Sequence, residues 1–213
     1  MAKEVKRCVI ISGAPETDID YIAPLCDGAF VICADSGYLK AQKLGINIDL
    51  IIADFDSAGE PKLDCKIKKL PVQKEHTDTF ECVITAVDMG FSDITVVGGI
   101  GTRVDHSYSN ILCLDYCKKR DTQCTIVSKN TRISLISEAR RIYREYQWFS
   151  LFAFMEECRG VSISGAHYTA GFYGLDKLDF KPSDQFGQSN FVEGEFATVT
   201  VDKGTLLLIE SND

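Results

Sequence analysis

The sequence predicts an α/β protein in which an N-terminal domain with a parallel sheet is followed by a smaller antiparallel β-sandwich domain. Up to about residue 137, short apolar runs alternate with longer segments of helical periodicity, a pattern typical of a parallel sheet covered on both faces. From residue 138 onward, short strand-like runs are separated by Gly, Asn, Asp and Pro, and no long helical period appears. We therefore expect two domains, at residues 1–137 and 138–213.

In the first domain the apolar runs are the expected strands, and capping or turn residues mark the expected helices. The strands are expected at residues 8–11, 30–34, 50–53, 94–97 and 124–127. The helices are expected to begin near Thr17 or Asp18, to run from Ser36 to Leu44 before Gly45, to end at Gly90 after a periodic run from Phe80, and to span residues 105–118. The basic segment 62–69 shows no regular pattern.

The expected strands of the second domain are less regular. The segment 141–154 is rich in aromatic residues and alternates in part, and further strand-like runs lie at residues 161–163, 191–200 and 205–209. A β-sandwich of roughly seventy residues buries little surface by itself, so we expect it to pack on the first domain or on a partner chain.

Composition restricts the classes of function. The formal net charge of −8 argues against nucleic-acid and anionic-membrane partners, which call for a basic surface. The nine cysteines include no Cys-x-x-Cys pair, so they argue against a zinc site and for reduced thiols in the core of a cytoplasmic protein. The apolar run ending at Ile11 is too short for a signal peptide or a membrane span.

Acidic residues stand directly after several of the expected strands. Asp35 follows the run 30–34, and Asp54 and Asp56 follow the run 50–53. Because ligands bind outside the carboxyl ends of strands in open α/β sheets, these acids are expected to share one edge. Their oxygens suit Mg²⁺, which prefers carboxylates, water and substrate phosphates. Two acids one residue apart also arise often by chance, so a surface turn with solvated side chains is the alternative.

The segment after the run 94–97 contains glycines and an arginine. Residues 98–101 read Gly-Gly-Ile-Gly and lack the third glycine of a dinucleotide fingerprint. Glycines between a strand and a helix nevertheless let backbone N–H groups approach a phosphate. Arg103 is expected either to clamp phosphate oxygens or to pair with a nearby acid. No Walker A motif occurs, which excludes a P-loop nucleotide site.

Further polar candidates precede the third expected helix. Lys74 is a possible phosphate contact, although a lone lysine is most often only solvated. Thr77 and Asp78 have a second reading as helix caps, and Asp35 has the same alternative at the preceding helix.

These segments together resemble the motif series of the thiamine pyrophosphokinase family. The resemblance covers most of the chain, from about Val9 to Ile209, and the series is far more specific than any one of its members. The motifs are Asp35-Ser36-Gly37, Asp54-Phe55-Asp56-Ser57, Lys74-x-x-Thr77-Asp78, Gly98-Gly99-x-Gly101-x-Arg103-x-Asp105-His106 and Ser189-Asn190. Ser36 stands where many relatives have a second glycine.

The resemblance implies transfer of the pyrophosphoryl group of ATP to the hydroxyl of thiamine, giving thiamine diphosphate and AMP with Mg²⁺ as cofactor. It implies that the catalytic carboxylates are Asp35, Asp54, Asp56, Asp78 and Asp105. Of these, the metal ligands are expected to be Asp54, Asp56 and Asp78. The ATP and phosphate contacts are expected to be Lys74, Thr77, Gly99, Gly101 and Arg103.

The resemblance also implies a homodimer whose active sites lie between subunits, with thiamine contacts at Tyr168, Ser189 and Asn190 in the β-sandwich domain. Thiamine is a flat cation without a phosphate, so aromatic faces and neutral hydrogen-bonding groups suit it. On the residues alone, a core aromatic at Tyr168 and an ordinary turn at Ser189-Asn190 fit equally well.

Two other classes of function fit an acidic site on an α/β sheet. One is a different Mg²⁺-dependent phosphotransferase or phosphohydrolase, which would release ADP or inorganic phosphate. The other is a non-catalytic module that senses nucleotide or thiamine and leaves ATP unaltered.

Overall fold

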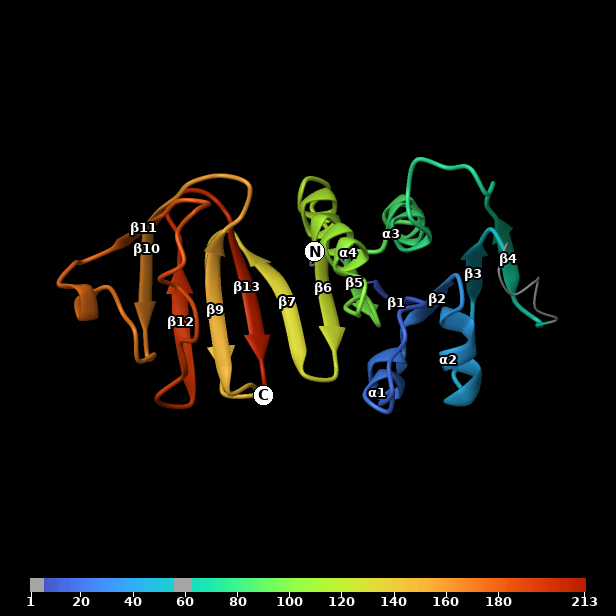
Figure 1. Ribbon diagram of the computed structural model, residues 1–213, viewed down its shortest axis with the longest axis horizontal. Coiled ribbons are helices and arrows are strands. Elements are labelled where there is room, and N and C mark those ends of the chain that lie inside the picture. Colours follow the sequence, from blue (N-terminus) through green and yellow to red (C-terminus); the bar gives the residue numbers. More distant parts are fainter. Residues whose placement is uncertain (1–5, 56–62) are drawn as a thin grey trace, which may run out of the picture. The chain divides into compact units, whose positions relative to one another are not determined.

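The computed structural model describes residues 6–55 and 63–213 (Figure 1). Asp56 and Ser57, which belong to the expected metal-binding motif, lie outside the described residues. The chain forms two compact units, Met1–Lys129 and Asn130–Asp213. The division lies at residues 129/130 and not at 137/138, because residues 131–136 form a strand that pairs within the second unit.

In the described part of the first unit, six parallel strands follow one another in the order β4-β3-β2-β1-β5-β6. They are β1 (Arg7–Ile11), β2 (Phe30–Ala34), β3 (Leu50–Ala53), β4 (Lys66–Lys69), β5 (Asp93–Val97) and β6 (Gln123–Ser128). The parallel α/β architecture expected for this part of the chain is confirmed.

The strand β4 is absent from the expected elements. Its residues Lys66, Lys68 and Lys69 are exposed, and only Ile67 turns inward, so the segment carries too little apolar character to be read as a strand. It pairs with β3 alone and lies at the edge of the six-stranded order. Lysines suit that place because their charges oppose pairing with another chain.

Among the described residues of this unit, four helices cover the sheet, and Figure 1 shows α1 and α2 on one face and α3 and α4 on the other. They are α1 (Ile22–Cys26), α2 (Gly37–Lys43), α3 (Asp78–Asp88) and α4 (Val104–Lys118). The expected cap near Thr17 or Asp18 is wrong: α1 begins after Tyr21, with no side-chain cap. Its first residue Ile22 is buried in the core, so packing and not capping sets where it begins.

The order of the strands fixes where a ligand can bind. From β1 the chain adds β2, β3 and β4 on one side, and then returns to place β5 and β6 on the other side. The loops that leave β1 and β5 therefore diverge at their carboxyl ends. Such a switch point opens a crevice, which is the usual ligand site of an open α/β sheet.

The core of the first unit explains the cysteines. Both faces of the sheet are covered, so β3 is buried along its whole length, as parallel strands usually are. None of the nine cysteines, all of which are described, forms a disulfide, and most of them are buried. Burial raises the pKa of Cys8 and of Cys113 to about 12, which keeps these thiols protonated and unreactive at neutral pH. They are core residues, as expected.

The second unit consists of two antiparallel sheets with the orders β7-β13-β9 and β11-β10-β12-β8. The strands are β7 (Thr131–Ile136), β8 (Ala139–Tyr143), β9 (Trp148–Ala153), β10 (Cys158–Ser164), β11 (Leu178–Phe180), β12 (Phe196–Thr200) and β13 (Leu206–Ser211). The expected strand at residues 191–200 is regular only from Phe196, because its first part makes isolated bridges.

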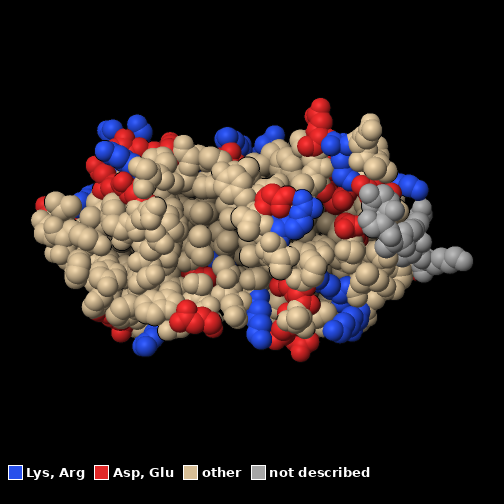
Figure 2. Space-filling model, viewed as in Figure 1, with Lys and Arg blue, Asp and Glu red and all other residues tan. Residues whose placement is uncertain are grey.

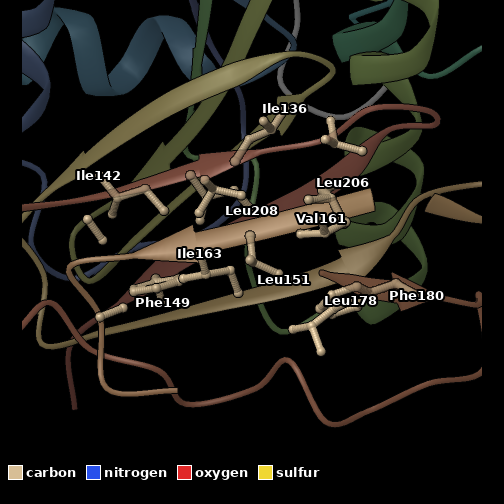
Figure 3. Close-up of a cluster of buried hydrophobic side chains, with 14 of the residues drawn as sticks. Ile136, Ile142, Phe149, Leu151, Val161, Ile163, Leu178, Phe180, Leu206 and Leu208 are labelled. Carbon is tan, nitrogen blue, oxygen red and sulfur yellow. The ribbon is translucent and has the colours of Figure 1, made fainter. Parts of the chain in front are cut away.

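One hydrophobic core joins these two sheets. Phe149, Leu151 and Leu208 come from the first sheet, and Val161 and Phe180 come from the second (Figure 3). All five are at most 2% exposed. The smaller β-sandwich domain predicted from the sequence is therefore confirmed.

A buried ion pair crosses the first of these sheets. Arg132 on β7 donates two hydrogen bonds of 2.6 Å to the carboxylate of Glu210 on β13. The Glu210 side chain is only 2% exposed, and the two-pronged geometry offsets the cost of burying its charge.

Helices of the described chain are all too short or too polar to cross a lipid bilayer.

Candidate active site

A cavity of about 470 Å³ lies at the switch point of the first unit. Its walls come from the segment after β1, from single residues after β2 and β3, from residues 72–79 before and within α3, and from the loop between β5 and α4. Eight expected site residues line it: Asp35, Asp54, Lys74, Thr77, Asp78, Gly99, Gly101 and Arg103. The fold thus collects at one place residues that are spread over about a third of the chain.

Two carboxylates and one ammonium form the centre of this cavity. Lys74 Nζ lies 2.5 Å from Asp54 Oδ2 and 2.9 Å from Asp78 Oδ1. The three side chains are between 11% and 20% exposed. Burial disfavours the charge of Lys74, but its contacts with the two carboxylates outweigh burial and raise its pKa. The lysine therefore stays charged between the acids.

The carboxyl group of Asp78 has a raised pKa. Burial raises its pKa, the contact with Lys74 lowers it in part, and the nearby charges of Asp54 and Asp35 raise it again, so that the net shift is upward. Its buried Oδ1 makes an ion-pair contact of 2.9 Å with Lys74 Nζ and accepts no hydrogen bond from the described residues. This oxygen is a suitable ligand for a further cation.

Tight turns place Asp35 and Asp54 in the lining of the cavity. Asp35 and Phe55 have φ values of 47° and 56°, in the left-handed region that side chains rarely adopt. Gly37 allows the turn after Asp35 to exist, since any Cβ at this position would overlap the carbonyl oxygen of Ile11. Asp35 does not cap α2, whose N-cap is Ser36 without a side-chain cap bond.

Thr77 combines two functions. Its Oγ1 accepts a 3.2 Å hydrogen bond from the N–H of Phe80 and so caps α3, as one reading of the sequence predicts. Because the residue also lines the cavity, the cap fixes the place at which Asp78 enters the helix.

Two side chains of α4 hold the glycine loop. Asn110, which is 5% exposed, donates a 2.7 Å hydrogen bond to the carbonyl of Gly99. Ser107 Oγ, one helical turn earlier, accepts a 3.1 Å bond from the N–H of Gly101 and lies 3.3 Å from the carbonyl of the same residue. Both contacts fix backbone that lines the cavity, next to the N-terminus of a 15-residue helix.

Arg103 and Asp105 form an exposed pair at the start of α4. Arg103 Nη2 lies 2.5 Å from Asp105 Oδ2, and the two side chains are 67% and 64% exposed. The hydrogen bond from Arg103 lowers the pKa of Asp105. Arg103 reaches the lining of the cavity, whereas Asp105 is not among the lining residues. The pair matches the alternative in which the arginine binds a nearby acid.

The expected thiamine contacts lie in the second unit. The Asn190 side chain is buried and accepts a 2.9 Å bond from the N–H of Tyr168, while its amide donates a 2.8 Å bond to the carbonyl of the same residue. Asn190 thus fixes the backbone of Tyr168. Ser189 has a φ of 54° and donates its N–H to Ser150 Oγ. The Tyr168 ring is half-buried and packs edge-on against Phe172, with ring centres 5.0 Å apart.

Comparison with known proteins agrees with this geometry. The family model described as "Thiamin pyrophosphokinase, catalytic domain" matches residues 25–126. Over these residues the chain is therefore similar to the catalytic domain of the thiamine pyrophosphokinase family. The match includes the acids, the lysine and the glycine loop of the cavity.

Solved structures show that the whole chain has the fold of these enzymes. The thiamine pyrophosphokinase of Bacillus subtilis is 22% identical, and the match covers 98% of this chain and 100% of that one with a TM-score of 0.88. The enzyme of Geobacillus thermodenitrificans is 20% identical, with coverages of 97% and 98% and a TM-score of 0.81. Yeast thiamin pyrophosphokinase is 14% identical, with coverages of 98% and 87% and a TM-score of 0.78. Comparison with curated protein sequences gives no significant match.

The cavity of the first unit has oxygens that fit Mg²⁺. Asp54 and Asp78 face each other across Lys74, and the buried Oδ1 of Asp78 has no hydrogen-bond donor among the described residues. Residues 6–55 and 63–213 contain no group of three or more His, Cys, Asp or Glu side chains placed to hold a metal ion. A pair of carboxylates fits Mg²⁺ because this ion usually keeps several waters and substrate phosphate oxygens as ligands.

The structure also adds cavity residues that the sequence did not single out. Ser12 and Gly13 follow β1, and Asn110 and Ser107 support the glycine loop from α4. His76 and His106, which the sequence leaves scattered, both line the cavity. The position of Ser12 directly after an apolar strand was the one available signal, and it is the same signal that identifies Asp35.

Proposed function

We propose that the protein transfers the pyrophosphoryl group of ATP to the hydroxyl of thiamine and releases thiamine diphosphate and AMP. The observation that carries this proposal is the set of Asp54, Lys74 and Asp78 in a cavity at the switch point of a thiamine pyrophosphokinase catalytic domain. Transfer of this group needs little covalent help from a protein, because positioning and neutralisation of charge supply most of the catalysis.

The acids form the metal-binding part of the site in this proposal. We assign the metal ligands to Asp54, Asp56 and Asp78, with Asp35 and Asp105 completing the acidic loops. When bound there, Mg²⁺ neutralises phosphate charge and draws electron density from the phosphorus under attack. One carboxylate that is not a metal ligand then accepts the proton of the thiamine hydroxyl.

Cationic and N–H groups contact the phosphates of ATP in this proposal. Lys74 and Arg103 are the cations, and Arg103 exchanges Asp105 for phosphate oxygens. Gly99 and Gly101 present backbone, and the N-terminus of α4 adds a partial positive charge. Thr77 holds the start of α3 so that Asp78 and Lys74 keep their places.

The second unit supplies the thiamine contacts. We propose that the ring of Tyr168 stacks on thiamine and that Ser189 and Asn190 lie beside it. Asn190 acts chiefly by fixing the backbone of Tyr168. Aromatic side chains around Tyr168 are exposed, among them Phe172 at 59% and Tyr173 at 41%.

These exposed aromatics also support a homodimer with active sites between subunits. On the face of the second unit that Figure 2 presents, the charged side chains lie mainly at the margins. An uncharged surface with exposed aromatic residues is typical of a protein interface. Cysteines that form no disulfides suit a reducing compartment, and we place the protein in the cytoplasm.

One assay tests the reaction. The purified protein is incubated with Mg²⁺, ATP and thiamine, and a matched sample lacks thiamine. We expect AMP and thiamine diphosphate in equal amounts, and neither product without thiamine. ADP with thiamine monophosphate would contradict pyrophosphoryl transfer. Inorganic phosphate alone would indicate a phosphohydrolase, and unaltered ATP would indicate a sensing module.

A further inference from the structure

A second charged pair lies next to the cavity without lining it. Lys40 on α2 donates hydrogen bonds of 3.1 Å to Glu16 Oε2 and of 3.0 Å to the carbonyl of Ser12. Both side chains are only 11% exposed. Neither residue is among those that line the cavity, but Ser12 is. The pair therefore touches the site through the backbone of the segment that follows β1.

Tyr21 is a second hydrogen-bond donor to the carboxylate of Glu16. Its hydroxyl donates a 2.9 Å hydrogen bond to Glu16 Oε1, so each carboxylate oxygen has its own donor. Burial, together with the bond to Glu16, raises the pKa of Tyr21, and the phenol stays protonated as this bond requires. Glu16 is thus fixed from two sides, by α2 and by the residue before α1.

The same pair supports the loop that leaves β5. A Cβ at Gly98 would meet Lys40 Nζ first, and then Glu16 Oε2 and the carbonyl of Ser12. Gly98 has a φ of 64° and therefore turns the chain over this pair at close range. Both loops of the switch point, after β1 and after β5, rest on the Lys40–Glu16 pair.

Ser12 connects the Lys40–Glu16 pair to the wall of the cavity. Its N–H donates a 2.9 Å bond to the carbonyl of Val97, and its Oγ lies 2.9 Å from Oγ1 of Thr79 on α3. The segment 12–15 forms one wall of the cavity and is joined to β5, α2 and α3 at this single residue.

We propose that Lys40 and Glu16 are positioning residues, which hold the segment 12–15 in the shape that receives the phosphates of ATP. The proposal rests on the proposed function, because it assigns the cavity to ATP. A wall that is already ordered before binding avoids the entropic cost of ordering it with the ligand. Loss of the pair should therefore weaken ATP binding although neither side chain touches the nucleotide.

The test uses variants that separate positioning from stability. Lys40→Met and Glu16→Gln each remove one partner and leave the other charge buried, which destabilises the fold by itself. The double variant Lys40→Met with Glu16→Gln has the wild-type net charge and no buried lone charge. Lys43→Met, at an exposed lysine three residues further along α2, is the matched control.

Three quantities are measured on each variant: the thermal unfolding midpoint, the Kd of a non-hydrolysable ATP analogue with Mg²⁺ and without thiamine, and the KM values of both substrates. For the double variant we expect a near-normal midpoint, a Kd and an ATP KM raised about tenfold or more, and a thiamine KM within about twofold of wild type. Lys43→Met should match wild type in all three.

The outcomes separate this inference from the proposed function. A folded double variant with unchanged analogue affinity would overturn the positioning role, even if the wild-type protein makes thiamine diphosphate. The wild-type protein could bind the ATP analogue and yet form no thiamine diphosphate, which would contradict the proposed reaction. A raised Kd in the double variant would then still support the positioning role. A wild-type protein that binds no ATP analogue would overturn both.

Discussion

Asp78 is subject to opposing effects that a surface carboxylate does not meet. Burial and the neighbouring acids raise its pKa, and Lys74 offsets only part of that increase. A carboxylate in such a place costs folding free energy when it is charged without a metal. In the proposed function, a divalent cation bound between Asp54 and Asp78 would remove this repulsion.

Replacing Asp78 tests this interpretation. Asp78→Asn keeps the shape of the side chain and removes its charge, so kcat/KM should fall by about two orders of magnitude or more while the folded structure persists. Asp88→Asn, at the exposed end of the same helix, is the control and should stay within about twofold of wild type. Steady-state kinetics and circular dichroism measure the two effects. Near-normal turnover in Asp78→Asn would remove this acid from the site.

At this scale the sequence predicts the residues that follow strands and misses those that act through contacts. Asp35 and Asp54 are found because they directly follow apolar strands, and Asp78 is found because it begins a helix. Asn110 and Lys40 are missed because their partners, Gly99 and Ser12, are 11 and 28 residues away in sequence. No local pattern reports such a hydrogen bond, and only the folded sheet brings the partners together.

Among the elements, α2 packs closely on the end of β1. Gly37 begins this helix directly above the end of β1, and the space that a side chain would need is filled by the carbonyl of Ile11. The close approach brings Lys40 within reach of Ser12 and Glu16. The glycine of the Asp35-Ser36-Gly37 motif is therefore needed for packing, whereas Asp35 itself lines the cavity.

A Gly37→Ala substitution should force α2 away from β1. Because the added methyl group meets backbone and not a flexible side chain, we expect the free energy of unfolding to fall by about 2 kcal/mol or more. Gly194→Ala is the matched control: nothing lies within 4 Å of its Cβ, and its φ is not positive. That variant should change stability by less than about 0.5 kcal/mol. Urea denaturation measures both, and equal stabilities would contradict the close packing of α2.

The sequence analysis misses β4 and misplaces the start of α1, and both errors have the same kind of physical cause. The strand β4 has alternating lysines in place of an apolar run, and its pairing with β3 alone makes it a strand. The helix α1 begins by packing Ile22 into the core, with no capping side chain to mark its start. Edge pairing and packing are tertiary effects, which override local propensity.

For the whole molecule, the change of pattern in the sequence predicts two domains but not the residue at which the first ends and the second begins. The strand β7 looks like a continuation of the first domain, because it follows β6 after a two-residue turn. Its partner β13 lies about seventy residues later and assigns it to the second unit. The roles of the two units, ATP in the first and thiamine in the second, are the part of the proposal that kinetics can separate.

Tyr168→Ala should affect one substrate and not the other. Loss of one aromatic face over a flat cation raises the thiamine KM by roughly tenfold or more, while the ATP KM remains near its wild-type value. The control is Tyr143→Ala, another partly exposed tyrosine of the second unit, on β8. Equal increases in both KM values, or no change, would exclude Tyr168 from the thiamine site.

The two variants together test whether each active site is shared between subunits. In a mixed dimer of Asp78→Asn and Tyr168→Ala subunits, one site receives both defects and the other receives neither, provided that each site combines the first unit of one subunit with the second unit of the other. Random mixing gives half of the dimers this composition, so activity at low thiamine should return to roughly a quarter of the wild-type value. The subunits are unfolded and refolded together, and separately refolded samples that are then combined without exchange serve as the control. If each site lies within one subunit, every site in the mixture keeps one defect, and co-refolding should restore nothing beyond the sum of the two separate activities.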